Sequence, residues 1–272
     1  MIELKYILNF INLIFDKKFT TLAGAISFFL LINGGTALLL LLTLFNLLNI
    51  SIKFNYSFLP EEVVRVLIYF INNATFTKGY SVFFLITSIW GASSLFVQLI
   101  QAGELIYGKK RTQKGLIKRL IAIIILITFI FLSIGGFSLL SIATRFINFI
   151  QYGFVSIFTK NLISFLLPFI LVLFINVWIP PVKLSINKAI PGTLFTNIYW
   201  LLATVFYNFY LKNFCNLTQI YGAIAFLLIF ILWLFIMTNG LIIGIIINYY
   251  IHKMYLIRKN NKDTILLNTR GD

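Results

Sequence analysis

The stretch that decides the fold runs from Ser81 to Arg119 and reads SVFFLITSIWGASSLFVQLIQAGELIYGKKRTQKGLIKR. It begins with an uncharged run long enough to cross a bilayer as one helix, which takes about 20 apolar residues. One acid, Glu104, stands at the end of that run, and the densest group of basic residues in the chain follows it. Because basic residues gather in cytoplasmic segments, the stretch predicts a span whose end lies at the inner face.

The composition is that of an integral membrane protein. Of the 272 residues, 60% are hydrophobic and only 11% are charged, whereas charged residues make up about 25% of a soluble domain. The net charge of +15 comes from 22 Lys and Arg that lie mainly in short segments between apolar runs. This placement indicates contact with cytoplasm and anionic lipid headgroups. We therefore expect the lipid bilayer as partner and no nucleic acid.

Several functional classes lack their sequence signals. Cys215 is the single cysteine, so the sequence permits no intrachain disulfide and no cysteine-based metal site. No glycine-rich nucleotide loop is present, which argues against an ATP-driven pump within this chain. The N-terminal segment has no short apolar core followed by a small-residue cleavage site, so no cleavable leader is expected. We predict no cofactor.

Apolar runs predict an all-α membrane domain over residues 1–252, with six transmembrane helices, and a basic cytoplasmic tail at 253–272. The predicted spans are residues 22–48, 81–103, 120–144, 161–179, 189–211 and 220–250. Residues Glu3 to Asp16 have one apolar face, which favours a helix in the inner interface, although an ordinary packing helix is equally compatible. Pro60 and Glu61-Glu62 begin a predicted amphipathic helix between spans one and two, on the outer side.

Charge distribution predicts the orientation of the bundle. Six spans place both termini on one side, and that side carries 16 of the Lys and Arg against 6 on the other. The positive-inside rule therefore predicts a multi-pass protein of a bacterial inner membrane with both termini in the cytoplasm. The sequence leaves a homo-oligomer open.

Polar side chains within the apolar runs are candidates for a transport site. In the second span, polar and small residues from Thr87 to Glu104 fall within an arc of roughly 150°, so this stripe should face protein or water. A buried acid can bind a cation, a proton or a headgroup. Alternatively, Glu104 lies at the inner interface, neutralised by Lys109 or Lys110. The candidate transport or polar-cavity residues are Asn33, Ser94, Gln98, Gln101, Glu104, Asn239 and Asn248.

Glycines and prolines form a second group, with predicted structural roles. Asn33-Gly34-Gly35-Thr36 in the first span indicates either a broken helix lining a polar cavity or close packing of helices, and we favour packing. Pro180-Pro181 should end the fourth span, and Pro191 should lie in the first turn of the fifth. The structural or packing positions are Gly34, Gly35, Pro180, Pro191, Gly192, Tyr221, Gly222, Gly240 and Gly244.

The order of short motifs along the chain resembles that of the BrkB/YihY family of bacterial inner-membrane proteins. The motifs are Ala23-Gly-Ala-Ile-Ser-Phe-Phe29, Ala92-Ser-Ser-Leu-Phe96, Ile106-Tyr-Gly108, Ile179-Pro180, Ala189-Ile-Pro-Gly192, Tyr221-Gly222, Trp233-Leu234 and Gly244 to Asn248. The resemblance covers most of the chain and implies a six-span helical fold. It also brings an old assignment as a transfer-RNA-processing ribonuclease, and proposals of serum resistance and of lipid or solute export.

This sequence departs from the family pattern at three places. Asn33 and Thr36 stand where the family tends to have Ser and Pro, and Glu104 stands near a common Asn. Ile246 replaces an acid that is frequent in the family, which puts in doubt any activity that depends on that acid.

Weighing these observations, we expect transport or export of a lipid or small solute. The alternative is a non-transporting envelope protein that interacts with lipid. A polar cavity reaching Asn33, Gln98 and Glu104 would favour transport, and a tight core would favour the structural role. A metal-dependent ribonuclease needs several His, Asp or Glu converging on an ion. The chain has one His and seven acids, so we expect no enzyme.

Overall fold

The computed structural model describes residues 16–47, 81–112, 115–149, 153–214 and 223–268. Within these ranges the chain forms six helices and no strand, which confirms the all-α prediction for this part of the chain. The helices are α2 (Lys17–Leu47), α4 (Ser81–Tyr107), α5 (Leu116–Phe149), α6 (Gly153–Trp178), α7 (Ile186–Phe214) and α9 (Ala223–Asn268). They follow the order of the predicted spans.

Four of these helices contain stretches long and apolar enough to cross a membrane. The stretches are Ile86–Tyr107, Leu116–Leu139, Ile186–Leu211 and Leu228–Ile257, and Phe165–Trp178 is a shorter apolar stretch. Large apolar side chains are exposed on the outer surface, for example Phe131 on α5 at 69% and Phe206 on α7 at 68%. An apolar surface of this kind suits contact with lipid chains, because exposing it to water would be energetically unfavourable.

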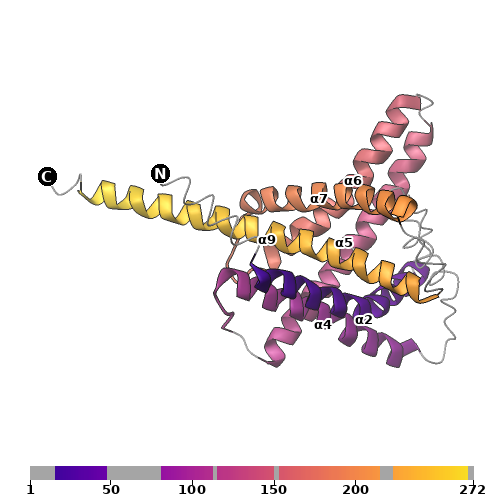
Figure 1. The fold of residues 1–272 in the computed structure, drawn as a ribbon, viewed down its shortest axis with the longest axis horizontal. Coiled ribbons are helices and arrows are strands. Elements are labelled where there is room, and N and C mark those ends of the chain that lie inside the picture. Colours follow the sequence, from indigo (N-terminus) through magenta and orange to yellow (C-terminus); the bar gives the residue numbers. More distant parts are fainter. Residues whose placement is uncertain (1–15, 48–80, 113–114, 150–152, 215–222, 269–272) are drawn as a thin grey trace.

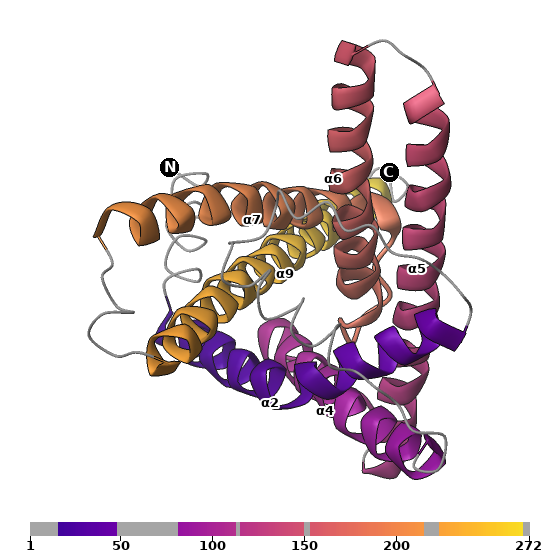
Figure 2. The same ribbon diagram turned by 90° about the vertical axis from the view of Figure 1, so that its right-hand side faces the viewer.

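The helices pack as a closed ring (Figure 2). Each helix contacts the next one in the chain, from α2 through α4, α5, α6 and α7 to α9, and α9 returns to pack along α2. A hydrogen bond from the Thr238 hydroxyl to the Ala23 carbonyl, 3.1 Å long, joins α9 to α2 where the ring closes. The buried apolar core includes Ile26, Ile100 and Ile245 from three different helices.

The helices differ from the predicted spans at several boundaries; α6, for example, begins at Gly153, eight residues before the predicted start of the fourth span. Helix α2 runs without interruption through Asn33 and Gly34, so the broken-helix alternative for this span is wrong. Helix α7 begins at Ile186, which places Pro191 in its second turn instead of its first. The hydrogen bond that this proline cannot donate would go to the carbonyl of Asn187, an exposed residue.

Helix α9 continues through 46 residues to Asn268, well past the predicted end of the sixth span. Its length is about 69 Å at 1.5 Å per residue, more than twice the roughly 30 Å hydrocarbon thickness of a bilayer. Figure 1 shows its C-terminal part projecting beyond the other helices. Most of the predicted tail is therefore helical. Asp16, the last residue of the helix predicted from Glu3 to Asp16, is not helical, and the rest of that prediction lies outside the described residues. The predicted amphipathic helix that begins at Pro60, and Tyr221 and Gly222, also lie outside them.

Candidate functional site

A central cavity of about 520 Å³ lies within the ring, and all six helices line it. Its walls are mainly Leu, Ile and Phe side chains, such as Leu30 of α2, Phe96 of α4 and Phe129 of α5. The polar side chains at its wall belong to α7 and α9: Asn197, Trp200, Thr204, Trp233 and Thr238. The volume lies within the range of about 300–1,000 Å³ that ligand pockets occupy. The cavity can therefore hold a ligand of mostly apolar character.

The candidate residues of spans one and two do not meet in this cavity. Gly34 lines it, whereas its neighbour Asn33 donates from Nδ2 to the Phe29 carbonyl of its own helix at 3.2 Å. Gln98 is half-buried and Gln101 is exposed. A methyl group added to Gly34 would have only Leu30 within 4 Å, at 3.4 Å, because the helix faces open space there. The predicted polar cavity shared by Asn33, Gln98 and Glu104 is not what the described residues form.

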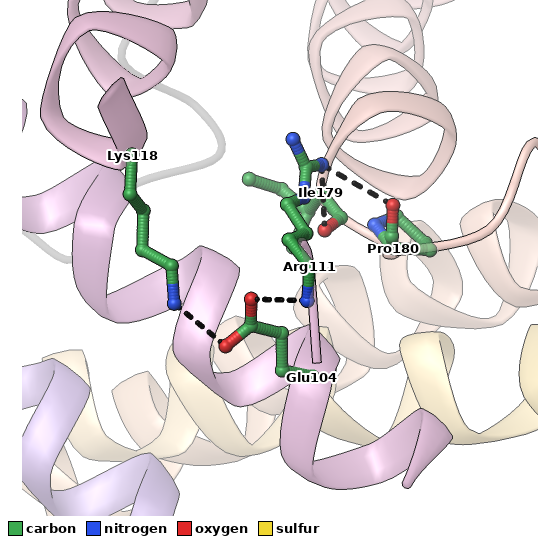
Figure 3. Close-up of polar contacts among 5 residues, drawn as sticks. All are labelled: Glu104, Arg111, Lys118, Ile179 and Pro180. Carbon is green, nitrogen blue, oxygen red and sulfur yellow. Dashed lines mark hydrogen bonds and ion pairs between the residues drawn. The ribbon is translucent and has the colours of Figure 1, made fainter. Parts of the chain in front are cut away.

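Glu104 lies instead in a clamp at the end of α4 (Figure 3). Its Oε2 atom forms an ion pair with Lys118 Nζ of α5 at 2.7 Å, and its Oε1 atom accepts a hydrogen bond from the Arg111 backbone at 2.9 Å. The prediction that Lys109 or Lys110 neutralises Glu104 is therefore wrong, because the partner is Lys118. Both lysines follow the turn at Gly108 and are exposed, whereas α5 returns across the end of α4.

The turn after α4 explains the position of Arg111. Gly108 has a φ of +61°, a conformation that costs little only for glycine. The Gly108 N–H donates to the Leu105 carbonyl at 3.4 Å, and the Lys109 N–H donates to the Glu104 carbonyl at 3.2 Å. This pair of bonds is a Schellman motif, which ends α4 and turns the chain back toward Arg111.

Arg111 joins the end of α4 to the turn after α6. Its Nη2 atom donates to the carbonyls of Trp178, Ile179 and Pro180 at 2.7, 3.3 and 3.2 Å. Burial lowers the pKa of the guanidinium from its usual value, and the Glu104 carboxylate opposes this shift. A proline pair supplies no backbone donors, so the arginine satisfies carbonyls that the ended helix leaves open. Glu104, Lys118 and Arg111 thus form a structural clamp between α4, α5 and α6.

Arg119 makes the equivalent connection further along the polar stripe of α4. Its Nη2 atom donates to the Trp90 carbonyl at 2.6 Å and to the Ser94 hydroxyl at 3.0 Å. The guanidinium also lies over the Trp90 ring, 4.1 Å from its centroid. Consecutive residues of α5, Lys118 and Arg119, therefore contact two levels of the stripe. The stripe is nevertheless mixed, because Ser94 is half-buried and Glu104 is buried, whereas Thr87, Trp90 and Gln101 are exposed.

The α7–α9 seam consists of small residues spaced four apart on both helices. A methyl group added to Gly244 would lie 2.0 Å from Thr196 Oγ1, and one added to Gly192 would lie 2.1 Å from the Gly244 carbonyl. Asn248 follows in the same register, and its Oδ1 atom accepts a hydrogen bond from Gly192 N–H at 2.8 Å. A methyl group added to Gly240 would lie 2.3 Å from the Tyr199 ring. The structure therefore brings Gly192, Gly240, Gly244 and Asn248 together.

A further polar contact at α7 was not among the predicted site residues. Asn176 of α6 is fully buried and donates from Nδ2 to the Thr193 hydroxyl at 2.9 Å, which in turn donates to the Ala189 carbonyl. An Asn in an apolar run is the sequence signal that could have identified Asn176. By contrast, Asn239 donates to the Phe235 carbonyl of its own helix at 2.7 Å. In the described ranges, no three His, Cys, Asp or Glu side chains form a group able to hold a metal ion.

Comparison with known proteins now identifies the relationship. A sequence model of the family described as virulence factor BrkB matches residues 13–264. The chain belongs to this family. The resembling motifs of the BrkB family fall on contacts described above: Ile179-Pro180 accepts from Arg111, and Gly192 and Gly244 form the α7–α9 seam. Ile246, which stands at the position of a frequent acid, is fully buried in the apolar core.

Two groups of relatives also match. The ribonuclease-like protein YfkH of Bacillus subtilis is 24% identical over 184 residues, which cover 64% of this chain and 66% of YfkH. A UPF0761 membrane protein, found in several strains of Coxiella burnetii, is 30% identical over 88 residues, 31% of this chain and 32% of its own length. The chain thus spans just under two thirds of the first relative and about one third of the second. No solved structure matches this chain.

Proposed function

We propose that this BrkB-family chain is a six-span protein of a bacterial inner membrane that transports or exports lipid. The central cavity is the observation that carries the proposal. Six helices surround it, its walls are mostly apolar, and its volume is about 520 Å³. A sugar, an amino acid or an inorganic ion would leave its polar groups unsatisfied against such walls. An acyl chain has no polar groups that would be left unsatisfied there, so the cavity favours a lipid over a small polar solute.

The orientation forms part of the same proposal. The ends of α4 and α6, the start of α7 and the part of α9 near Tyr255 lie at one end of the bundle, where Arg111 reaches the Pro180 carbonyl and Lys188 lies 3.3 Å from the Tyr255 ring centroid. The loops there hold Lys109, Lys110 and Lys183, and Lys253 lies two residues before Tyr255. The start of α2, which holds Lys17 and Lys18, lies at the same end in Figure 1. The positive-inside rule supports placing it, with both chain termini, in the cytoplasm.

A second function uses the same cavity without transport. The interhelical contacts around it are extensive, and the clamp of Glu104, Lys118 and Arg111 ties three helices together. A lipid held permanently in the cavity would make the chain a lipid-binding structural protein of the envelope. Flux, not binding, separates the two functions.

The decisive experiment compares two glycine variants in proteoliposomes that contain a fluorescent phospholipid. Gly34→Phe places a large ring in the cavity, because only Leu30 stands near this position. Gly135→Phe places the same ring on the exposed face of α5, where no atom lies within 4 Å of an added methyl group. We expect the unmodified chain and Gly135→Phe to move lipid between leaflets faster than empty vesicles, and Gly34→Phe to lose that activity.

Equal flux in both variants would exclude the cavity from the path. Retained lipid without any flux in the unmodified chain would favour the structural alternative. We also propose that the chain performs no ribonuclease reaction. Incubating the purified protein with RNA and Mg²⁺ or Mn²⁺ tests this directly, and metal-dependent cleavage by the pure protein would contradict it.

A further inference from the structure

A second hollow lies outside the ring of helices, at its basic end. This groove, about 810 Å³ in volume, separates the loop after α4 from the turn between α6 and α7. Its cationic rim consists of Lys109, Lys110 and Lys183, all exposed. Arg111 also borders it, with its guanidinium directed at the carbonyls of the turn (Figure 3). The groove is separate from the central cavity but lies close to it, because Ile125 lines the groove and the next residue, Leu126, lines the cavity.

The three lysines carry positive charge that no acid in the described part of the chain neutralises. The single ion pair there joins Lys118 to Glu104, so the one acid near the groove already has a cationic partner. The Arg111 backbone N–H and Lys118 together occupy both carboxylate oxygens. Three ammonium groups around one hollow therefore favour an anion as its occupant.

The floor and far wall of the groove are apolar. Ile121 and Ile124 of α5 face Val177 and Trp178 of α6, and Leu184 follows the proline pair. Trp178 is 52% exposed, and Trp side chains favour the boundary between headgroups and acyl chains. A phosphate ion or a nucleic acid would use the lysines and leave this wall without a function. An amphiphile with an anionic head uses both surfaces.

We propose that this groove binds the headgroup of an anionic phospholipid, with the phosphate at Lys109, Lys110 and Lys183 and the glycerol and upper acyl chains against Ile124 and Trp178. The inference deepens the proposed function by naming a headgroup class, and it rests on that function only for what happens to the lipid after it binds. Binding itself is measured at equilibrium and requires no flux.

The test measures lipid selectivity with spin-labelled phospholipids. Purified protein in phosphatidylcholine bilayers is supplied with spin-labelled phosphatidylglycerol or spin-labelled phosphatidylcholine, and the motionally restricted fraction gives the relative affinity. The groove variant is Lys109→Gln/Lys110→Gln/Lys183→Gln. Its matched control, Lys17→Gln/Lys18→Gln/Lys253→Gln, removes the same charge from exposed positions at the same end, outside the groove. Both variants change surface residues, so both should fold, and size-exclusion chromatography verifies this.

We expect the unmodified protein to prefer phosphatidylglycerol and the groove variant to lose that preference, while the control keeps it. Each basic residue near anionic lipid contributes about fivefold to binding at low salt, so the loss should exceed about tenfold. Equal losses in both triple variants would reduce the site to general surface charge and overturn the proposal. Displacement of the labelled lipid by millimolar inorganic phosphate would also overturn it, because the groove would then recognise a free anion. Selective binding without any flux supports the groove and refutes only transport.

Discussion

The substitution Gly244→Ala tests the packing of α7 on α9 most directly. The added methyl group would lie 2.0 Å from Thr196 Oγ1 and 2.7 Å from the Gly192 carbonyl oxygen, whereas real Cβ contacts stay beyond 3.0 Å. The second obstacle is backbone and cannot rotate away, so the helices must separate. Overpacking of this kind costs about 1–3 kcal/mol, and the two simultaneous clashes place Gly244→Ala near the upper end. The better helix propensity of Ala offsets up to about 1 kcal/mol of that cost.

The assay is thermal unfolding of the purified protein in detergent, followed by the loss of monodisperse protein. A net loss of about 2 kcal/mol lowers the midpoint by about 4–8 °C for a chain of this size. The matched control is Gly135→Ala on α5, where an added methyl group has no neighbour within 4 Å. Its midpoint should stay unchanged or rise slightly. If Gly244→Ala behaves like Gly135→Ala, α7 and α9 do not approach as closely as described, and the reasoning about the seam fails.

Three other predictions follow from the polar contacts. In a double-mutant cycle, Glu104→Gln and Lys118→Met should each destabilise the protein, with a coupling energy of about 1–3 kcal/mol. Lipid flux per folded molecule should stay unchanged. A loss of flux in Glu104→Gln without a loss of stability would instead assign Glu104 a role in transport. Arg111→Lys should speed amide hydrogen exchange at residues 182–185, because the lysine side chain is shorter and its ammonium would not reach the position from which Nη2 contacts three carbonyls; unaltered exchange would contradict the clamp. Asn248→Ala should lower the free energy of unfolding by about 1–2 kcal/mol, because it leaves the Gly192 N–H without its side-chain acceptor. Asn239→Ala loses only a bond within its own helix, so its effect should stay within about 0.5 kcal/mol. Equal effects of the two variants in thermal unfolding would refute the distinction.

The polar residues show which parts of the candidate site could be predicted from the sequence. It identified Glu104 as an exceptional acid and supplied both explanations for it, but its partner was predicted among the nearest basic residues in the chain. The structure pairs it with Lys118, 14 residues away. Sequence distance is a poor guide here because the Schellman turn at Gly108 leaves Lys109 and Lys110 exposed, while the start of α5 crosses the end of α4.

The glycines also show that the sequence alone does not identify which residues are in contact. The spacing of Gly240 and Gly244 predicted close packing, and both lie against α7. The pair Gly34-Gly35 carried a similar signal, yet Gly34 borders the cavity and has only Leu30 of its own helix nearby. A small residue permits a close approach but does not require one. Whether a helix occupies the space beside it depends on how the neighbouring helices cross.

The sequence by itself determined that the described chain is helical, that its helices follow a fixed order, and that basic residues gather in the segments between them. These features depend on local composition, because an apolar run must satisfy its backbone within one helix to enter lipid. The tertiary structure alone decided which helical faces are buried, where the cavity lies and which polar groups meet. In a soluble helix, the contrast between core and water marks the buried face. Lipid and protein core are both apolar, so in this chain the sequence carries no such contrast, and only the packed helices reveal the cavity and the basic groove.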